Sequence, residues 1–256
     1  MKTSKLIAAI LVAASSLALM APAQSAIVAD IVFVIDTSGS MGGDIDEVKS
    51  RLSQFDGIML AAGVNANYGL VRFGGAASLI QNITTFTDFS RSGGPFATLT
   101  ANGGGTEDGS AAMLTALLAS FRNDSVRNII LVTDENDDVA TNRNALDLAL
   151  AATAQNELIN IVGNPNDDDN NYYRNLAPAN GGAFFNILDF RANPGPFFTN
   201  FVNVKLNEII GDFCTRFPND PTCVNRVPEP GSLALIGLAL AGLAGVRSSR
   251  RRRAAA

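Results

Sequence analysis

An apolar strand that ends in oxygen-bearing side chains is the feature that most constrains this chain. Residues 31–35 are all apolar, and Asp36, Ser38 and Ser40 follow at intervals of two. In an open α/β sheet, ligands gather beyond the carboxyl ends of the strands, so these side chains face that crevice. Mg2+ prefers octahedral oxygen coordination and is usually held by one or two carboxylates. The segment favours a divalent-cation site, although Asp, Ser and Gly also suit an ordinary turn and helix cap.

Two further segments strengthen the cation interpretation. Residues 102–106 form a glycine-rich loop that ends in the hydroxyl of Thr106, just before an apolar helix pattern. Residues 129–134 form a second buried-type strand, and it ends in Asp134. Together with the first loop, these segments resemble the von Willebrand factor type A domain and its metal-ion-dependent adhesion site (MIDAS). The resemblance covers roughly residues 28 to 212.

The resemblance implies a role for each of the five residues. Ser38 and Ser40 would coordinate the ion directly through their hydroxyls. Asp36 and Asp134 would act mainly through bound waters, and Thr106 would join the coordination shell when an acidic partner is engaged. The implied ion is Mg2+ or Mn2+, with Ca2+ as a further candidate. Because neutral hydroxyls leave the ion incompletely neutralised, an Asp or Glu carboxylate of a partner can complete its coordination.

Strands that alternate with helices predict the fold class. Apolar residues recur at helical spacing over residues 45–59, and residues 68–73 and 78–84 have the pattern of a β-hairpin. The next expected helix has an apolar face made of Leu114, Leu117, Leu118 and Phe121. This alternation predicts an α/β domain with a mostly parallel sheet and helices on both faces. The resemblance adds a doubly wound, Rossmann-like sheet of six strands with one antiparallel edge strand, within a domain of residues 27–212.

The N-terminal segment has the pattern of a secretory signal. Lys2 and Lys5 give a positive start, residues 6–20 are nearly all apolar, and residues 21–26 are mostly small. These three parts in this order predict a signal peptide over residues 1–26 that signal peptidase removes. A buried helix is the alternative, but the segment shows no amphipathic pattern.

The C-terminal segment predicts a membrane anchor that is later removed. Val227, Pro228, Glu229 and Pro230 precede an uncharged stretch over 231–246 and then a cluster of arginines. As a helix this stretch spans about 24 Å, slightly less than a hydrocarbon core of about 30 Å. The order of parts over 227–253 resembles the PEP-CTERM sorting signal of Gram-negative bacteria, which implies a transient inner-membrane anchor and cleavage by an exosortase. A permanent anchor is the alternative; a basic nucleic-acid tail fits less well.

Cys214 and Cys223 are the two cysteines of the chain, and both lie in a predicted linker over residues 213–226. In an exported protein, such a pair predicts a disulfide. A free or intermolecular thiol is the alternative.

Charge and composition narrow the function classes. Seven of the 19 Lys and Arg residues lie in the removable ends, so the exported domain carries a net charge of about −12. Such a charge repels nucleic acid and suits cations. The chain has no His, which excludes a Ser-His-Asp triad and His-bearing zinc sites. Asp36 lies in a segment with a faint likeness to an aspartic-protease motif, but no second copy exists, so we predict that the protein is not an enzyme.

Other acidic loops are expected to be solvated. Asp137 and Asp138 lie just beyond Asp134, and Asp167, Asp168 and Asp169 lie in a polar loop over 164–171. A second cation site in that polar loop is the alternative.

Taken together, these patterns predict an exported, metal-dependent adhesion or ligand-binding domain at the cell surface or in the extracellular matrix. Its partner would be an unidentified protein or polysaccharide with an acidic group. The alternative is a structural matrix protein whose metal site only stabilises the fold; a hydrolase fits less well.

Overall fold

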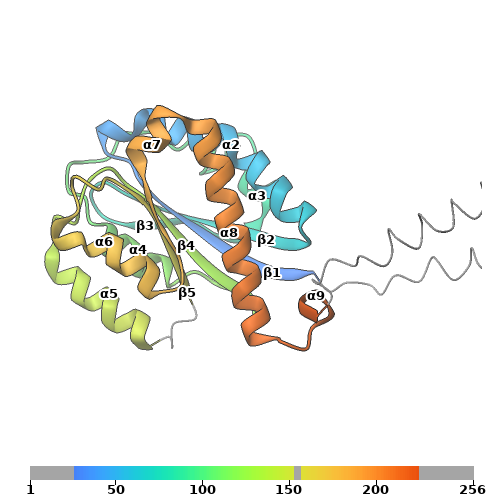
Figure 1. The fold of residues 1–256 in the computed structure, drawn as a ribbon. Coiled ribbons are helices and arrows are strands. Elements are labelled where there is room, and N and C mark those ends of the chain that lie inside the picture. The colour runs from blue at the N-terminus through green and yellow to red at the C-terminus, as the bar shows by residue number, and fades with distance from the viewer. Residues whose placement is uncertain (1–25, 153–156, 225–256) are drawn as a thin grey trace, which may run out of the picture.

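A six-stranded sheet in the order β3-β2-β1-β4-β5-β6 organises the domain (Figure 1). The computed structural model describes residues 26–152 and 157–224. Within these residues the strands are β1 (Ile27–Asp36), β2 (Val64–Phe73), β3 (Ser78–Thr85), β4 (Val126–Val132), β5 (Glu157–Gly163) and β6 (Phe184–Asn186). Every neighbouring pair is parallel except β2 and β3, which are antiparallel. The predicted doubly wound sheet with one antiparallel edge strand is therefore confirmed.

Helices cover both faces of the sheet, because the central strands are apolar on both sides. One face packs against α2 (Gly42–Ala61), α3 (Phe86–Phe89), α7 (Ile187–Ala192) and α8 (Pro194–Arg216). The other packs against α4 (Gly109–Ala116), α5 (Ala140–Ala152) and α6 (Tyr172–Ala179). Short turns η1 (Gly39–Met41) and η2 (Asp169–Asn171) and the small helix α9 (Pro221–Val224) complete the described chain.

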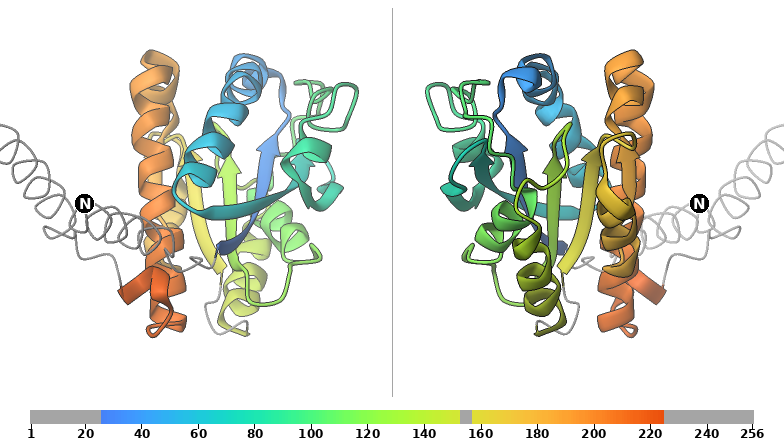
Figure 2. Two further views of the ribbon diagram at one scale, coloured as in Figure 1. Left: turned by 90° about the vertical axis from the view of Figure 1, so that its right-hand side faces the viewer. Right: turned by 90° about the vertical axis from the view of Figure 1, so that its left-hand side faces the viewer.

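The parallel strands give the molecule two different ends. In Figure 2 the arrowheads of β1 and β4 point to the end at which α2 begins. The described chain starts at the other end, where β1 begins, and it finishes close by in α9 (Figure 1). Loops that follow β1 and β4 therefore meet at one end, and the first and last described residues lie at the opposite end.

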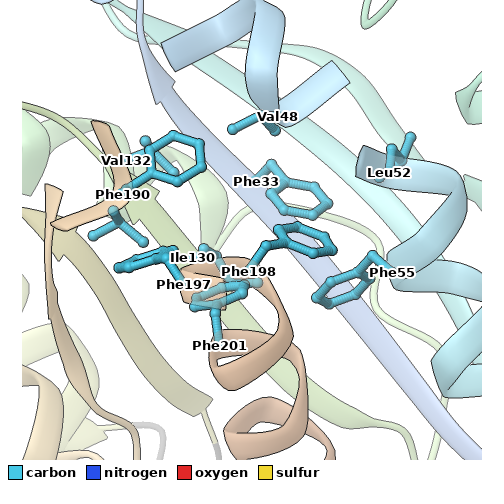
Figure 3. Close-up of a pocket in the computed structure, with 11 residues that line it drawn as sticks. Phe33, Val48, Leu52, Phe55, Ile130, Val132, Phe190, Phe197, Phe198 and Phe201 are labelled. Carbon is cyan, nitrogen blue, oxygen red and sulfur yellow. The ribbon is translucent and has the colours of Figure 1, made fainter. Parts of the chain in front are cut away.

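Phenylalanines dominate the core between the sheet and α8. Phe33 of β1, Phe55 of α2, and Phe198 and Phe201 of α8 are all buried and converge in a small apolar pocket (Figure 3). The rings of Phe33 and Phe55 lie edge to face with centroids 5.9 Å apart, a favourable arrangement for aromatic pairs. This cluster fixes α2 and α8 against the sheet and so fixes the start of α2.

The predicted apolar face of α4 is correct only in part. Leu114, Leu117 and Phe121 are partly buried and pack against the core on this side of the sheet. Leu118, however, is 77% exposed and lies beyond the end of the helix at Ala116, and the fully buried residues of the helix include Ala112, Met113 and Ala116. The small side chains allow α4 to approach the strands closely.

A disulfide joins Cys214 near the end of α8 to Cys223 in α9. It closes a loop with a sequence separation of nine residues. Among the described residues, no helix has both the length and the apolar character that a membrane crossing needs. The predicted signal segment up to residue 25, the sorting motif and the apolar segment 231–246 lie outside the described residues.

A buried lysine lies on the inner side of α8. The Lys205 ammonium donates to both Glu208 carboxylate oxygens, at 2.9 and 2.7 Å, and to Oδ1 of Asn160 on β5. It also lies 4.8 Å from the ring centroid of Phe185. Burial lowers the pKa of Lys205 to about 8, and the charge of Glu208 only partly opposes this shift. Burial of the charged lysine therefore costs desolvation free energy.

We expect Lys205→Met to change how stability depends on pH. Between pH 8 and about 10.5 the unfolded chain keeps the lysine proton and the folded chain does not, so the free energy of unfolding of the wild type rises with pH. The variant lacks this rise, so the difference in unfolding free energy between the two proteins changes across this pH range. Urea unfolding of both proteins from pH 7 to 10.5 measures the difference. A constant difference across that range would contradict the prediction.

Candidate metal centre

Asp36 ends β1 and is fully buried. Its Oδ1 accepts a hydrogen bond from the Ser38 backbone N–H at 2.8 Å, and its Oδ2 accepts one from the Thr133 hydroxyl at 2.9 Å. Burial is the main cause that raises the pKa of Asp36, and these hydrogen bonds oppose it. The carboxylate is therefore fixed in orientation between β1 and the loop after β4.

Ser38, Ser40 and Asp134 form a continuous row from the β1 exit to the β4 exit. The two serine Oγ atoms are 3.1 Å apart, and Ser40 Oγ donates to Asp134 Oδ1 at 3.0 Å. Ser38 and Asp134 are buried, whereas Ser40 is exposed. The structure thus brings together four of the five residues that the sequence predicts for the site.

Thr106 differs from the other four predicted residues. Its side chain is exposed, and among the described residues its hydroxyl has no hydrogen bond to Asp36, Ser38, Ser40 or Asp134. The loop that carries it is attached through its backbone: Gly75 N donates to the Thr106 carbonyl at 2.7 Å, and Gly103 N donates to the Thr37 carbonyl at 2.7 Å. Thr106 is positioned beside the cluster but does not contact it through its hydroxyl.

Glu107 is a member of the cluster that the sequence analysis missed. One carboxylate oxygen from each of Asp36, Glu107 and Asp134 lies within 4.8 Å of the others, and all three residues are buried. Burial, followed by the charge of Asp36, raises the pKa of Glu107 to about 8. In sequence, an acidic residue just before a helix has the ordinary pattern of a capping turn, which hides its role. Its position directly after Thr106 is the signal that could have revealed it.

Arg191 is a second missed residue. It lies on α7, and its Nη2 donates to Asp134 Oδ2 at 2.8 Å and to Asp44 Oδ2 at 2.6 Å. Asp44 is in the first turn of α2, so one guanidinium joins the β4 exit, α2 and α7. Nothing in the sequence near residue 191 connects it with the loops of the site, because the contact depends on the fold.

Asp137 corrects a further expectation, because the sequence predicts a solvated loop for both Asp137 and Asp138. Asp137 is buried and accepts from the Ser110 backbone and hydroxyl, at 2.8 and 2.6 Å, and from the Tyr173 hydroxyl at 2.6 Å. Asp138 is exposed, yet its Oδ2 accepts from the Glu107 backbone N–H at 2.7 Å. Both residues anchor the start of α4, and Asp138 holds Glu107 in place.

Asp168 is likewise not simply solvated. Its side chain is almost fully buried, and its Oδ1 accepts from the Tyr173 backbone N–H at 2.9 Å, which attaches the polar loop to α6.

The chemistry of the cluster fits a hard divalent cation. Three buried carboxylates converge, and Glu107 Oε2 has no hydrogen-bond partner among the described residues. A buried, unpaired carboxylate oxygen is costly unless a cation or a proton offsets its charge. The donors are hydroxyl and carboxylate oxygens, which suit Mg2+, Mn2+ or Ca2+ better than ions that prefer nitrogen or sulfur.

Comparison with known proteins identifies the family. The model of the von Willebrand factor type A domain matches residues 30–199, so the chain belongs to this family. The model of the PEP-CTERM protein-sorting motif matches residues 226–252. Both resemblances drawn from the sequence are confirmed. No curated protein matches the sequence closely enough to count as a relative.

Solved structures with the same fold include one protein from the mussel byssus and one from Catenulispora acidiphila. Proximal thread matrix protein 1 from the mussel byssus has 15% identity and a TM-score of 0.52, over 72% of this chain and 47% of that one. A von Willebrand factor type A protein from Catenulispora acidiphila has 18% identity and a TM-score of 0.53, over 72% and 43%. This chain thus spans less than half the length of either protein. At these identities the likeness shows the fold alone.

A second structure of the mussel protein has a zinc-occupied MIDAS motif. It shares 17% identity and a TM-score of 0.50 with this chain, over 64% of this chain and 43% of that one.

The glycine-rich loop offers a matched pair of substitutions. A Cβ on Gly103 would lie 2.6 Å from the Thr37 hydroxyl oxygen and 2.7 Å from the Gly74 carbonyl oxygen, whereas on Gly104 its closest neighbour would be 3.8 Å away. We expect Gly103→Ala to lower the free energy of unfolding by about 1 to 3 kcal/mol, because the loop must move away from the β1 exit. Gly104→Ala should be close to neutral. Urea unfolding compares them, and equal effects would contradict the packing described.

Proposed function

We propose that this exported domain binds an acidic group of a protein or polysaccharide partner through a Mg2+ or Mn2+ ion held at the cluster. The observation that carries the proposal is the meeting of Asp36, Ser38, Ser40 and Asp134 at one end of the sheet, where a partner can reach Ser40. The role is recognition rather than catalysis, because the cluster offers a cation site and no His-dependent nucleophile.

Each residue has a distinct task in this proposal. Ser38 and Ser40 would hold the ion through their hydroxyls. Asp36 would orient bound water, because Ser38 and Thr133 already fix its two oxygens. Thr106, exposed on the glycine-rich loop, would contact the ion when the loop moves toward a bound partner. The ion itself would act as a Lewis acid toward the partner's carboxylate.

The sorting motif supports the proposed location. A PEP-CTERM motif over residues 226–252 is the mark of export in Gram-negative bacteria. We propose that signal peptidase and an exosortase process the two ends, that the C-terminal segment anchors the chain in the inner membrane only for a time, and that the mature domain acts at the cell surface or in the extracellular matrix.

A structural matrix protein is the second candidate. Its support is the shared fold with a mussel thread matrix protein, of which one structure carries zinc in its MIDAS motif. In that case a cation would mainly stabilise the fold by neutralising the carboxylates of Asp36, Glu107 and Asp134. The two candidates differ in partner binding: EDTA abolishes it in the first candidate, whereas in the second EDTA only lowers thermal stability.

We expect the full chain to bind one Mn2+ or Mg2+ ion, and Asp36→Asn to weaken that binding by about 10- to 100-fold, as is typical when an orienting carboxylate is lost. Titration calorimetry measures the affinity. Asp46→Asn is the matched control, because the Asp46 side chain is 81% exposed on α2, and it should bind like the wild type. Equal affinities for both variants would remove the metal-site assignment.

We expect Thr106→Ala to weaken partner binding more than metal binding. Water can replace one hydroxyl at the ion, whereas a partner carboxylate loses a preorganised contact. Adhesion of the purified protein to native host cells, in Mg2+ and in EDTA, measures the first effect, and calorimetry measures the second. Thr199→Ala, an exposed substitution on α8, is the control. Wild-type adhesion by Thr106→Ala in Mg2+ would favour the structural-metal candidate.

A further inference from the structure

We infer that Glu107 is a direct ligand of the cation and that it sets how strongly the bound cation attracts an acidic partner. This inference rests on the proposed cation site, but it assigns a residue that the MIDAS resemblance does not supply. The sequence predicts a site of two carboxylates and three hydroxyls. Glu107 adds a third carboxylate, so the site is more strongly anionic than predicted.

Hydrogen bonding distinguishes Glu107 from the other two carboxylates of the cluster. Both oxygens of Asp36 accept protein hydrogen bonds, as do both oxygens of Asp134, from Ser40 and Arg191. Glu107 is only 4% exposed, and its Oε2 is buried without a hydrogen-bond partner among the described residues. Of the three carboxylates, Glu107 therefore has the oxygen that most needs a cation.

The backbone of Glu107 is fixed, and its side chain is buried. Its N–H donates to Asp138 Oδ2 at 2.7 Å, and its carbonyl accepts from the Asp138 backbone N–H at 2.8 Å. Three residues further on, Ser110 is bound through its N–H and hydroxyl to buried Asp137. The segment from Glu107 to Ser110 is thus anchored at both of its ends. Little backbone conformational entropy is therefore lost when Glu107 binds an ion.

The charges around the ion give Glu107 its effect on the partner. Asp36, Asp134 and Glu107 bring three carboxylates to the cluster, and the single guanidinium of Arg191 is shared between Asp134 and Asp44. The charge of Glu135 also acts on Glu107. A divalent cation is therefore surrounded by more negative charge than it can balance, and the carboxylate of Glu107 further weakens its attraction for an incoming carboxylate. Glu107 therefore favours retention of the metal over recruitment of the partner.

The test compares Glu107→Gln with Glu47→Gln in the full chain. Glu47 lies on α2 beside Ser40 and Arg191, where it pairs with Arg51, so the control removes one negative charge at the same end of the molecule. We expect Glu107→Gln to weaken Mn2+ binding by about 10- to 100-fold, and Glu47→Gln to weaken it by less than about threefold. Electron paramagnetic resonance of free Mn2+ measures both. Equal affinities for the two variants would overturn the inference.

A second measurement reads coordination directly. Water-proton relaxation at saturating Mn2+ counts waters on the ion, and Glu107→Gln should show about one more than the wild type, because water takes the position of the carboxylate. Acetate, the simplest carboxylate probe, should bind the Mn2+ form of Glu107→Gln more tightly than that of the wild type. Unchanged relaxation shows that Glu107 does not touch the ion, and equal acetate affinity shows that it does not control recruitment.

The outcomes separate this inference from the proposed function. If the wild type binds no Mn2+, the proposed cation site itself is wrong. If the wild type binds Mn2+ and Asp36→Asn weakens it, while Glu107→Gln does not, only the role of Glu107 is wrong. Thermal unfolding of the metal-free proteins should show Glu107→Gln folded and at least as stable as the wild type, since the change removes a buried carboxylate with an unpaired oxygen. A metal-free variant that unfolds at a lower temperature would mean that Glu107 supports the fold and is not held ready for a cation.

Discussion

The parallel pairing of β1 with β4 is the constraint on which the rest of the structure depends. It places Asp36 beside the loop after β4, so that the Thr133 hydroxyl, 97 residues away in sequence, can donate to Asp36 Oδ2. Because parallel strands end at the same edge, the polar residues after each strand share one crevice. The aromatic contacts of α2 and α8 then fix the neighbouring elements against these two strands. The register between β1 and β4 therefore positions both the residues of the site and the strands against which the core packs.

Part of the fold and of the site can be predicted from local patterns in the sequence. The strand exits at Asp36 and Asp134 were predictable, because an uninterrupted apolar run that ends in a carboxylate differs from its surroundings. The antiparallel edge strand came from the family resemblance and is confirmed. The strand exits depend on a local pattern that a single sequence displays, whereas the strand order came from the family resemblance.

The missed residues depend on contacts between distant segments. Arg191 reaches Asp134 across 57 positions, and Asp137 is buried because Ser110 and Tyr173 converge on it. In sequence, an aspartate that follows a strand and a glutamate that precedes a helix look like solvated turn residues. In the folded domain Asp137 and Glu107 are buried, because tertiary packing covers them. The leucine pattern of α4 likewise does not reveal that Ala112 and Ala116 bring this helix close to the sheet.

The first and last described residues lie at the end of the molecule opposite the strand exits that carry the cluster of carboxylates (Figure 1). Under the proposed export route, any anchor that followed residue 224 would leave the domain at the end remote from the cluster. Removal of such an anchor would free the domain without changing the surroundings of the cluster. The disulfide between Cys214 and Cys223 ties the last described turn to α8, so a covalent bond fixes the place on the domain at which the described chain ends.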